Sequence, residues 1–220
     1  MTSAVSFDLA SYIEHTVLKA DATAHDVERL CAEAVAHQFF GVCVNPLFVA
    51  RARNWLESSA ARVITVVGFP LGAGLPQALA HEARCVVEAG AVEVDMVIPI
   101  GAALAGEWNR VGEHVQAVRE ACPEAVLKVI LETGYLTVEQ VEQAARAALS
   151  ASPQFLKTST GFGPRGASVA DVEQLKALCP PGVGIKASGG IRTRQFALDL
   201  VTAGATRLGT SSGVAIVTSS

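Results

Sequence analysis

The feature that most constrains the fold of this chain is an alternation, repeated about eight times, of short apolar runs with amphipathic helical patterns. Each apolar run has the length of a buried strand, and the segment after it carries apolar residues at helical spacing. The expected strands are residues 13–18, 40–44, 63–67, 92–98, 125–131, 155–158, 183–187 and 206–209. Such repeated units predict parallel strands joined by crossover helices.

Several of the expected helices have clear start signals. Thr23 and Ser168 are good N-caps, and Thr137 with Gln140 forms a capping-box pattern. Pro46 is placed to open a helix that runs to about residue 57. The remaining helices are expected at residues 75–89 and 107–121, from near residue 193, and from residues 211–212.

Eight strand–helix units in 220 residues predict the α/β class and a single closed (β/α)8 TIM barrel. We expect one domain covering residues 1–220, because no low-complexity or linker-like segment divides the chain. The alternative is an open doubly wound sheet. It is disfavoured because no GxGxxG follows the first expected strand.

Composition and charge exclude several classes of protein. A net charge of −4 and an isoelectric point near 5.7 give no support for nucleic-acid binding. The longest apolar runs are too short to span a membrane, and residues 1–9 lack the basic segment of a secretory signal. The five cysteines contain no CxxC and the five histidines no ligand spacing, which predicts a cytoplasmic protein without a zinc site.

In such a barrel, the active-site residues come from the C-terminal ends of the strands. Alternation along each strand predicts which polar side chains point inward. These are Cys43 and Asn45, Glu93 and Asp95, Lys128, Lys157 and Lys186. Three of the five lysines therefore lie in expected strands, where surface lysines are uncommon. Barrel closure would bring the three together with Asp95.

This arrangement predicts that Lys157 is a nucleophile. An ordinary lysine has a pKa of about 10.4, but burial and a nearby cation lower it, and the neutral amine can attack a carbonyl to form an imine. A lone strand lysine is more often an ion-paired structural residue, but one aspartate cannot neutralise three ammonium groups. Asp95 is a suitable carboxylate for proton transfer. Taken alone, Cys43 is a small core thiol, and Glu93 is either barrel filler or a support for the site.

Glycine-rich loops follow the sixth, seventh and eighth expected strands, at residues 160–163, 188–192 and 209–212. Glycine lets the backbone approach a ligand closely, and helix N-termini present N–H groups to anions. Barrels commonly bind phosphate at these loops, so we expect a phosphate site there.

Together these residues resemble the deoxyribose-phosphate aldolase family of class I aldolases. The matching motifs, which run through nearly the whole chain, are Ile13-Glu14-His15-Thr16, Val42-Cys43-Val44-Asn45-Pro46, Glu93-Val94-Asp95-Met96-Val97, Leu127-Lys128-Val129-Ile130-Leu131-Glu132, Phe155-Leu156-Lys157-Thr158-Ser159-Thr160-Gly161, Ile185-Lys186-Ala187-Ser188-Gly189-Gly190-Ile191-Arg192 and Gly209-Thr210-Ser211-Ser212.

The resemblance implies reversible cleavage of 2-deoxy-D-ribose 5-phosphate to D-glyceraldehyde 3-phosphate and acetaldehyde, in deoxyribose phosphate catabolism. Lys157 would form the Schiff base, Lys186 would lower its pKa and assist proton transfer, Asp95 would relay protons, and Lys128 would support the charge network. The substrate-binding residues would be Thr16, Cys43 and Thr160 along the sugar, and Gly161, Gly189, Gly190, Ile191, Arg192, Gly209, Ser211 and Ser212 at the phosphate.

The resemblance also implies that the partners are small sugar phosphates and aldehydes, with no cofactor and no metal, and a homo-oligomer for which a dimer is favoured. One departure from the family pattern concerns the phosphate site. Some members carry a lysine after the Lys-Thr-Ser-Thr-Gly motif for the phosphate, and this chain has Phe162.

Two other functions stay open at this stage. The chain could be a barrel enzyme that handles a sugar phosphate without an imine, such as an isomerase, or it could be a non-catalytic binder of a phosphorylated ligand.

Overall fold

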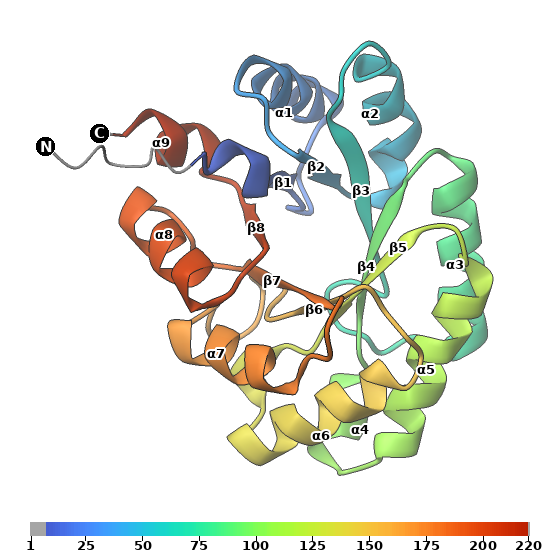
Figure 1. The fold of residues 1–220 in the computed structure, drawn as a ribbon. Helices are drawn as coiled ribbons and strands as arrows, with labels where there is room; N and C mark the ends of the chain where they lie inside the picture. Colours follow the sequence, from blue (N-terminus) through green and yellow to red (C-terminus); the bar gives the residue numbers. More distant parts are fainter. Residues whose placement is uncertain (1–7, 220) are drawn as a thin grey trace, which may run out of the picture.

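The eight expected strands form one closed parallel barrel in the computed structural model, which describes residues 8–219 (Figure 1). The strands are β1 (Ile13–Val17), β2 (Gly41–Val44), β3 (Arg62–Val67), β4 (Glu93–Val97), β5 (Val126–Ile130), β6 (Phe155–Lys157), β7 (Gly184–Ser188) and β8 (Arg207–Thr210). Each strand pairs with the next, and β8 pairs with β1. The (β/α)8 barrel is confirmed. Most of the segment expected to lack a secretory signal, residues 1–7, lies outside the described residues.

Helices surround the barrel (Figure 1). They are α1 (Ala24–Ala36), α2 (Val49–Trp55), α3 (Pro76–Glu88), α4 (Ile100–Leu104), α5 (Trp108–Ala121), α6 (Val138–Leu149), α7 (Val169–Leu178), α8 (Arg194–Ala203) and α9 (Gly213–Thr218). Three short 3-10 turns complete the described part: η1 (Ala10–Tyr12), η2 (Pro46–Phe48) and η3 (Thr133–Tyr135).

Two details of the helix predictions are wrong. Pro46 opens the turn η2, and α2 begins only at Val49 and ends at Trp55 rather than near residue 57. The helix α4, five residues long, was not expected, because a segment this short has too few turns for its apolar spacing to stand out.

The predicted N-caps are confirmed. The side chains of Thr23, Thr137 and Ser168 accept hydrogen bonds from the backbone three residues on, and each belongs to a complete capping box. Thr193 accepts in the same way from the N–H of Phe196. Each cap typically stabilises its helix by about 1 kcal/mol and sets the residue at which the chain turns back along the barrel.

The main hydrophobic core lies between the barrel and its helices. Strand residues that point outward, such as Val42, Val94, Leu127, Leu156 and Leu208, are completely buried there. Burial of one such aliphatic side chain contributes roughly 1.5–3 kcal/mol. This layer stabilises the barrel and leaves the inward positions of the strands open to other chemistry.

The interior of the barrel is divided into an apolar side and an ionic side. Leu18, Cys43, Ile64 and Val66 form a small apolar cluster near β2 and β3. The inward positions of β4 to β7 and of β1 instead carry buried charges, including Lys128 and Lys186, which are 0 % exposed. Buried charges are costly unless they are paired, so the charged side chains on the ionic side have to pair with one another.

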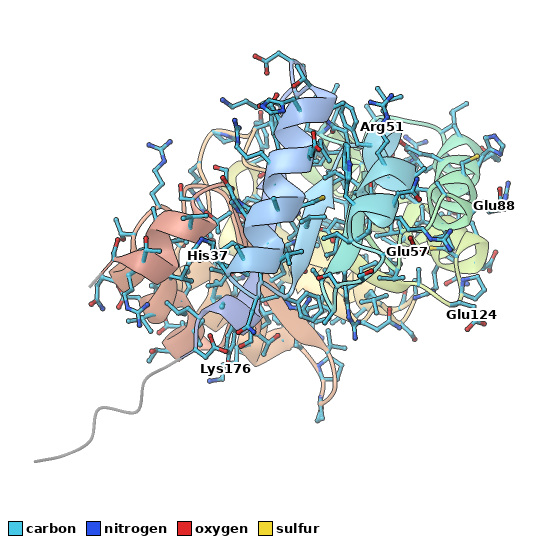
Figure 2. The ribbon with its side chains drawn as sticks, turned by 90° about the horizontal axis from the view of Figure 1, so that it is seen from above. His37, Arg51, Glu57, Glu88, Glu124 and Lys176 are labelled. Atoms are coloured by element: carbon cyan, nitrogen blue, oxygen red, sulfur yellow. The ribbon has the colours of Figure 1, made fainter. Side chains whose placement is uncertain are left out.

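Most other charged side chains lie on the outside. Figure 2 shows Arg51, Glu57, Glu88, Glu124 and Lys176 at the periphery of the molecule, pointing away from the barrel. No helix among residues 8–219 combines the length and the apolar character that crossing a membrane requires.

Candidate active site

Three carboxylates and three lysines meet inside the barrel. Strand pairing sets Asp95 beside Lys128, and Lys157 beside Lys186, while alternation turns all four side chains inward. The two further carboxylates come from Glu14 on β1 and Glu93 on β4. All six side chains are at most 3 % exposed. The structure thus brings together every lysine that the sequence places inward.

Lys128 sits at the centre of the carboxylates. Its Nζ lies 2.5 Å from Oε2 of Glu93, 3.0 Å from Oδ1 of Asp95 and 3.3 Å from Oε1 of Glu14. Burial lowers the pKa of Lys128, but Asp95 and Glu14 outweigh that effect, and the pKa ends above its ordinary value. Lys128 is therefore a fixed positive charge at neutral pH.

Lys186 is also held as a cation. Its ammonium donates to Glu14 and, at 2.6 Å, to Oδ2 of Asp95. Burial again lowers the pKa, and Asp95 and Glu14 again outweigh it, so the pKa of Lys186 is raised. A protonated Lys186 can donate a proton and repels positive charge on its neighbours.

Lys157 differs from both of these lysines. Its Nζ has one carboxylate partner, Oδ2 of Asp95 at 2.7 Å, and it reaches the wall of a cavity. Burial is the largest influence on its pKa, Asp95 opposes it, and the charge of Lys186 adds to it, so that the pKa of Lys157 is lowered. It is the lysine best able to become a neutral amine.

Two of the three carboxylates, Asp95 and Glu14, are held ionised by the same contacts. Burial alone would raise the pKa of Asp95, but Lys128, Lys157 and Lys186 hold it well below its usual range. The pKa of Glu14 is lowered as well, because Lys128 and Lys186 outweigh the effect of burial.

The structure corrects one step of the sequence argument. We expected three ammonium groups around a single carboxylate, but Glu14 and Glu93 provide two more, and Arg207 adds another cation 3.2 Å from Glu14. Glu14 was missed as a site residue, although it shares the inward face of β1 with Thr16. The lowered pKa of Lys157 therefore comes first from burial and then from the charge of Lys186, against the opposing effect of Asp95, rather than from a large excess of cations.

A cavity of about 370 Å³ opens above Lys157 at the C-terminal ends of the strands. Its wall includes ten residues that the sequence analysis assigned to the site, namely Thr16, Lys157, Thr160, Gly161, Gly189, Gly190, Ile191, Arg192, Gly209 and Ser211. Larger hollows of about 650 and 750 Å³ lie elsewhere on the molecule, but no buried titratable side chain lines either of them.

Some expected site residues lie elsewhere. Asp95, Lys128 and Lys186 lie beneath the cavity rather than on its wall, and Ser212 is also outside the lining. Cys43 is completely buried in the small apolar cluster, and burial raises the pKa of its thiol to about 11. Asn45 donates to the carbonyl of Lys19 and so holds the loop after β1.

Sequence reasoning missed six residues of the cavity wall, which are Val17, Leu18, Lys19, Phe162, Ser188 and Thr210. Four of them directly adjoin a residue already assigned to the site, and Leu18 lies two residues after Thr16, so a reading of the complete loops would have found these five. Lys19 is the exception that adds chemistry, because with Arg192 it places a second exposed cation on the wall.

Glycines with left-handed backbone form the wall on the side of β6 and β7. Gly161, Gly189 and Gly190 have φ values of 89°, 86° and 75°. The hydroxyl of Thr210, at the end of β8, donates to the carbonyl of Ile191 at 2.6 Å and so joins the loop after β8 to the loop after β7. Phe162 stands at the edge of the wall and meets Phe69 edge to face, with ring centroids 5.3 Å apart.

The chain was also compared with known proteins. The sequence model described as DeoC/LacD family aldolase matches residues 8–219. The deoxyribose-phosphate aldolase of Deinococcus radiodurans is 54% identical over 209 residues, covering 95% of each chain. That of Thermus thermophilus is 50% identical over 210 residues, covering 96% of each chain. A solved structure described as a tetrameric deoxyribose phosphate aldolase from Aeropyrum pernix is 34% identical, with a TM-score of 0.85 over 95% of this chain and 89% of that chain.

Proposed function

The chain belongs to the DeoC/LacD family of aldolases, and from that membership we propose that it cleaves 2-deoxy-D-ribose 5-phosphate through an imine on Lys157. The products are D-glyceraldehyde 3-phosphate and acetaldehyde, and the reaction is reversible. The enzyme would act in the breakdown of deoxyribonucleosides and deoxyribose phosphate.

One observation carries the proposed mechanism. Of the three interior lysines, Lys157 alone has a lowered pKa, and it also reaches the cavity. A nucleophilic amine has to be both neutral and accessible to the substrate, and Lys157 comes nearer to both conditions than Lys128 or Lys186 does. Lys128 and Lys186 are held as ammonium ions by their carboxylates, which suits them to electrostatic support.

In the first stage, Nζ of Lys157 attacks C1 of the open-chain aldehyde. The hydroxyl of the carbinolamine leaves as water after it gains a proton, and an iminium ion results. Asp95 lies 2.7 Å from Nζ of Lys157 and 2.6 Å from Nζ of Lys186. It can therefore pass protons between Lys186 and the reacting nitrogen, directly or through a water molecule.

In the second stage, the C2–C3 bond breaks. The C3 hydroxyl loses its proton and becomes the aldehyde oxygen, the C2–C3 bonding electrons form a C1–C2 double bond, the π electrons of the C=N bond move to nitrogen, and glyceraldehyde 3-phosphate leaves. The remaining enamine gains a proton at C2, and water hydrolyses the acetaldehyde iminium ion to release Lys157. Protonated Lys186 and Asp95 are the groups placed to supply and remove these protons.

The phosphate end of the substrate would lie against the glycine-rich side of the cavity. Backbone N–H groups of the loops after β6, β7 and β8 can donate to its oxygens, and Arg192 lies on the same wall. Lys19 is a further cation on this wall, which compensates in part for the presence of Phe162 at the position where some relatives carry lysine.

We also propose that the reaction needs no metal. Among the described residues, Glu14, Cys43 and Asp95 are the one group whose ligand atoms are close enough to hold an ion. The ammonium of Lys186 already occupies the position between Glu14 and Asp95. The charge that a metal would supply is thus supplied by a lysine.

Three further expectations remain proposals. They are that residues 1–220 form a single domain, that the protein is a homo-oligomer with a dimer favoured, and that it is cytoplasmic. Light scattering of the purified protein measures the second of these directly.

Reductive trapping tests the proposed function. Incubation with acetaldehyde and borohydride should add an ethyl group at Lys157, and mass spectrometry of the digest should locate it there. Exposed Lys176 serves as the internal control for non-specific alkylation. Turnover of deoxyribose 5-phosphate without an adduct on Lys157 would favour an imine-free enzyme, and phosphorylated-ligand binding without turnover would favour a binding protein.

A further inference from the structure

Glu132 is a buried carboxylate that the proposed mechanism does not use. It lies two residues after the end of β5, at the same end of the barrel as the cavity, and is 1 % exposed. Its backbone is left-handed, with φ 55° and ψ 59°. Residues other than glycine adopt this conformation rarely, and the surrounding structure has to hold them there.

The carboxylate of Glu132 is wrapped by the loop that follows β6. The N–H of Thr160 lies 3.1 Å from Oε2 and 3.3 Å from Oε1, and the hydroxyl of Thr160 donates to Oε2. Gly163 packs over the same carboxylate, where a Cβ atom would be 2.9 Å from Cδ of Glu132. The loop thus folds closely around an internal anion.

The neighbouring cation is engaged elsewhere. Arg165 lies on the same loop, but its guanidinium donates to Asp171 and, at 3.2 Å, to the carbonyl of Thr133. The hydrogen bonds that the carboxylate of Glu132 accepts therefore come from N–H and O–H groups of the loop, as they would for a bound anion, and Arg165 interacts with its charge only through space. Neutralising the carboxylate would weaken all of these contacts together.

The opposite face of this loop forms the cavity wall. Thr160, Gly161 and Phe162 line the cavity, and Phe162 donates its N–H to the hydroxyl oxygen of Thr160 at 2.9 Å. Since that hydroxyl already donates to Glu132, it has no proton left for a substrate oxygen. Thr160 therefore connects Glu132 to the wall through its hydroxyl, while the residue itself lines the cavity.

We propose that Glu132 is a positioning residue that fixes the turn at residues 160–163 and so sets the phosphate-side wall of the cavity. This inference rests on the proposed function, because it takes the phosphate to lie against that wall. Glu132 acts on binding of the phosphorylated end and takes no part in imine formation at Lys157.

The test compares two substrates on the full-length protein, 2-deoxyribose 5-phosphate and unphosphorylated 2-deoxyribose. In Glu132→Gln, KM for the phosphorylated substrate should rise about tenfold or more, the loss expected when a buried hydrogen-bonded group loses its charged partner. KM for 2-deoxyribose and kcat for both substrates should change by no more than about threefold. Glu173→Gln, at an exposed position of α7, should match the wild type.

A second pair of variants keeps the test decisive if Glu132→Gln folds poorly. Thr160→Val removes the hydroxyl that joins Glu132 to the wall, and it should also raise KM for the phosphorylated substrate selectively. Thr160→Ser keeps the hydroxyl and should restore KM to within about threefold of the wild-type value.

Borohydride trapping separates this inference from the proposed function. If the wild-type protein gives no acetaldehyde adduct at Lys157, the aldolase mechanism itself fails. If the wild type is trapped but the Glu132 and Thr160 variants lose activity equally on both substrates, or lose trapping, Glu132 acts on the chemistry and the inference is overturned.

Discussion

The interior of the barrel and the wall of the cavity above it handle charge in opposite ways. In the interior, Lys128, Lys186 and Asp95 carry full charges on side chains that water does not reach. On the wall, Gly161 and Gly189 offer backbone dipoles, and the cations Lys19 and Arg192 are exposed. The first region should therefore respond to any change in a side chain, and the second to changes in backbone shape.

The contrast has a physical origin. Charge interactions strengthen as the local dielectric constant falls. A buried ion pair can therefore shift the pKa of its members, whereas an exposed pair at the same distance shifts them much less. An imine requires such a shift in one lysine, whereas a phosphate keeps its charge at neutral pH and needs only donors at the right spacing. The two halves of the site thus use different parts of the chain for different tasks.

Removal of a charge from the interior should have the largest effect. Lys186→Leu should lower kcat at neutral pH by about a hundredfold or more, because a proton donor is lost. The same change removes the cation that helps to lower the pKa of Lys157, and it leaves Asp95 with one partner fewer. For both reasons the pKa of Lys157 should rise. The amine of Lys157 would then be neutral only at higher pH, and the rising limb of the pH–rate profile should shift to higher pH.

The matched control for this variant is Lys176→Leu, at an exposed position of α7. Denaturant unfolding should also show Lys186→Leu to be less stable by about 3–5 kcal/mol, because Glu14 and Asp95 lose a buried partner. An unchanged pH–rate profile in a folded Lys186→Leu protein would contradict the role given to Lys186.

Distortion of the cavity wall should have an intermediate effect on substrate binding. Substitution of two adjacent glycines separates the effect of backbone strain from that of a steric clash. Gly189 and Gly190 both have positive φ, so alanine should introduce backbone strain of about 1–2 kcal/mol at either position. A Cβ at Gly189 would lie 3.0 Å from Cα of Gly166 and 3.2 Å from Cα of Gly161, whereas nothing lies within 4 Å at Gly190.

Gly189→Ala should therefore push the two loops apart and raise KM for deoxyribose 5-phosphate several-fold more than Gly190→Ala does, with similar kcat values for the two variants. Steady-state kinetics with the phosphorylated substrate measures the difference. Equal KM values for the two variants would mean that the close approach of these loops is unimportant for binding.

Addition of a charge to the exposed wall should have the smallest effect. Phe162→Lys should lower KM for deoxyribose 5-phosphate by about two- to fivefold, the range expected for an exposed ion pair, and leave KM for 2-deoxyribose unchanged. Phe162 is 53% exposed, so added salt should screen the gain. Leu47→Lys adds the same charge outside the cavity lining and serves as the control. If Leu47→Lys lowers KM as much as Phe162→Lys does, the gain comes from long-range attraction and not from a contact with the phosphate.

Much of the fold could be predicted because it depends on neighbours in the sequence. Strand alternation placed Lys128, Lys157 and Lys186 inward, and the N-cap Thr23 and the capping box at Thr137 marked where α1 and α6 begin. These signals need only a few adjacent residues. The helix α4 was missed because it is shorter than two turns.

The charge balance of the site could not be predicted in the same way. Glu14 meets Lys186 across 172 positions of sequence, and Glu93 meets Lys128 only because β4 and β5 are adjacent. Sequence alone also gave no protein partner for the hydroxyl of Thr160, which the fold directs to Glu132, 28 residues away.

The sequence by itself determined the barrel and the strand positions of Lys157, Lys186 and Asp95, because hydrophobic spacing and strand parity are local properties of the chain. Only the tertiary structure decided which of the three interior lysines has a lowered pKa. A pKa depends on the charges and the solvent within a few ångströms, and barrel closure gives Lys128 and Lys186 two or more carboxylates each while leaving Lys157 with Asp95 alone.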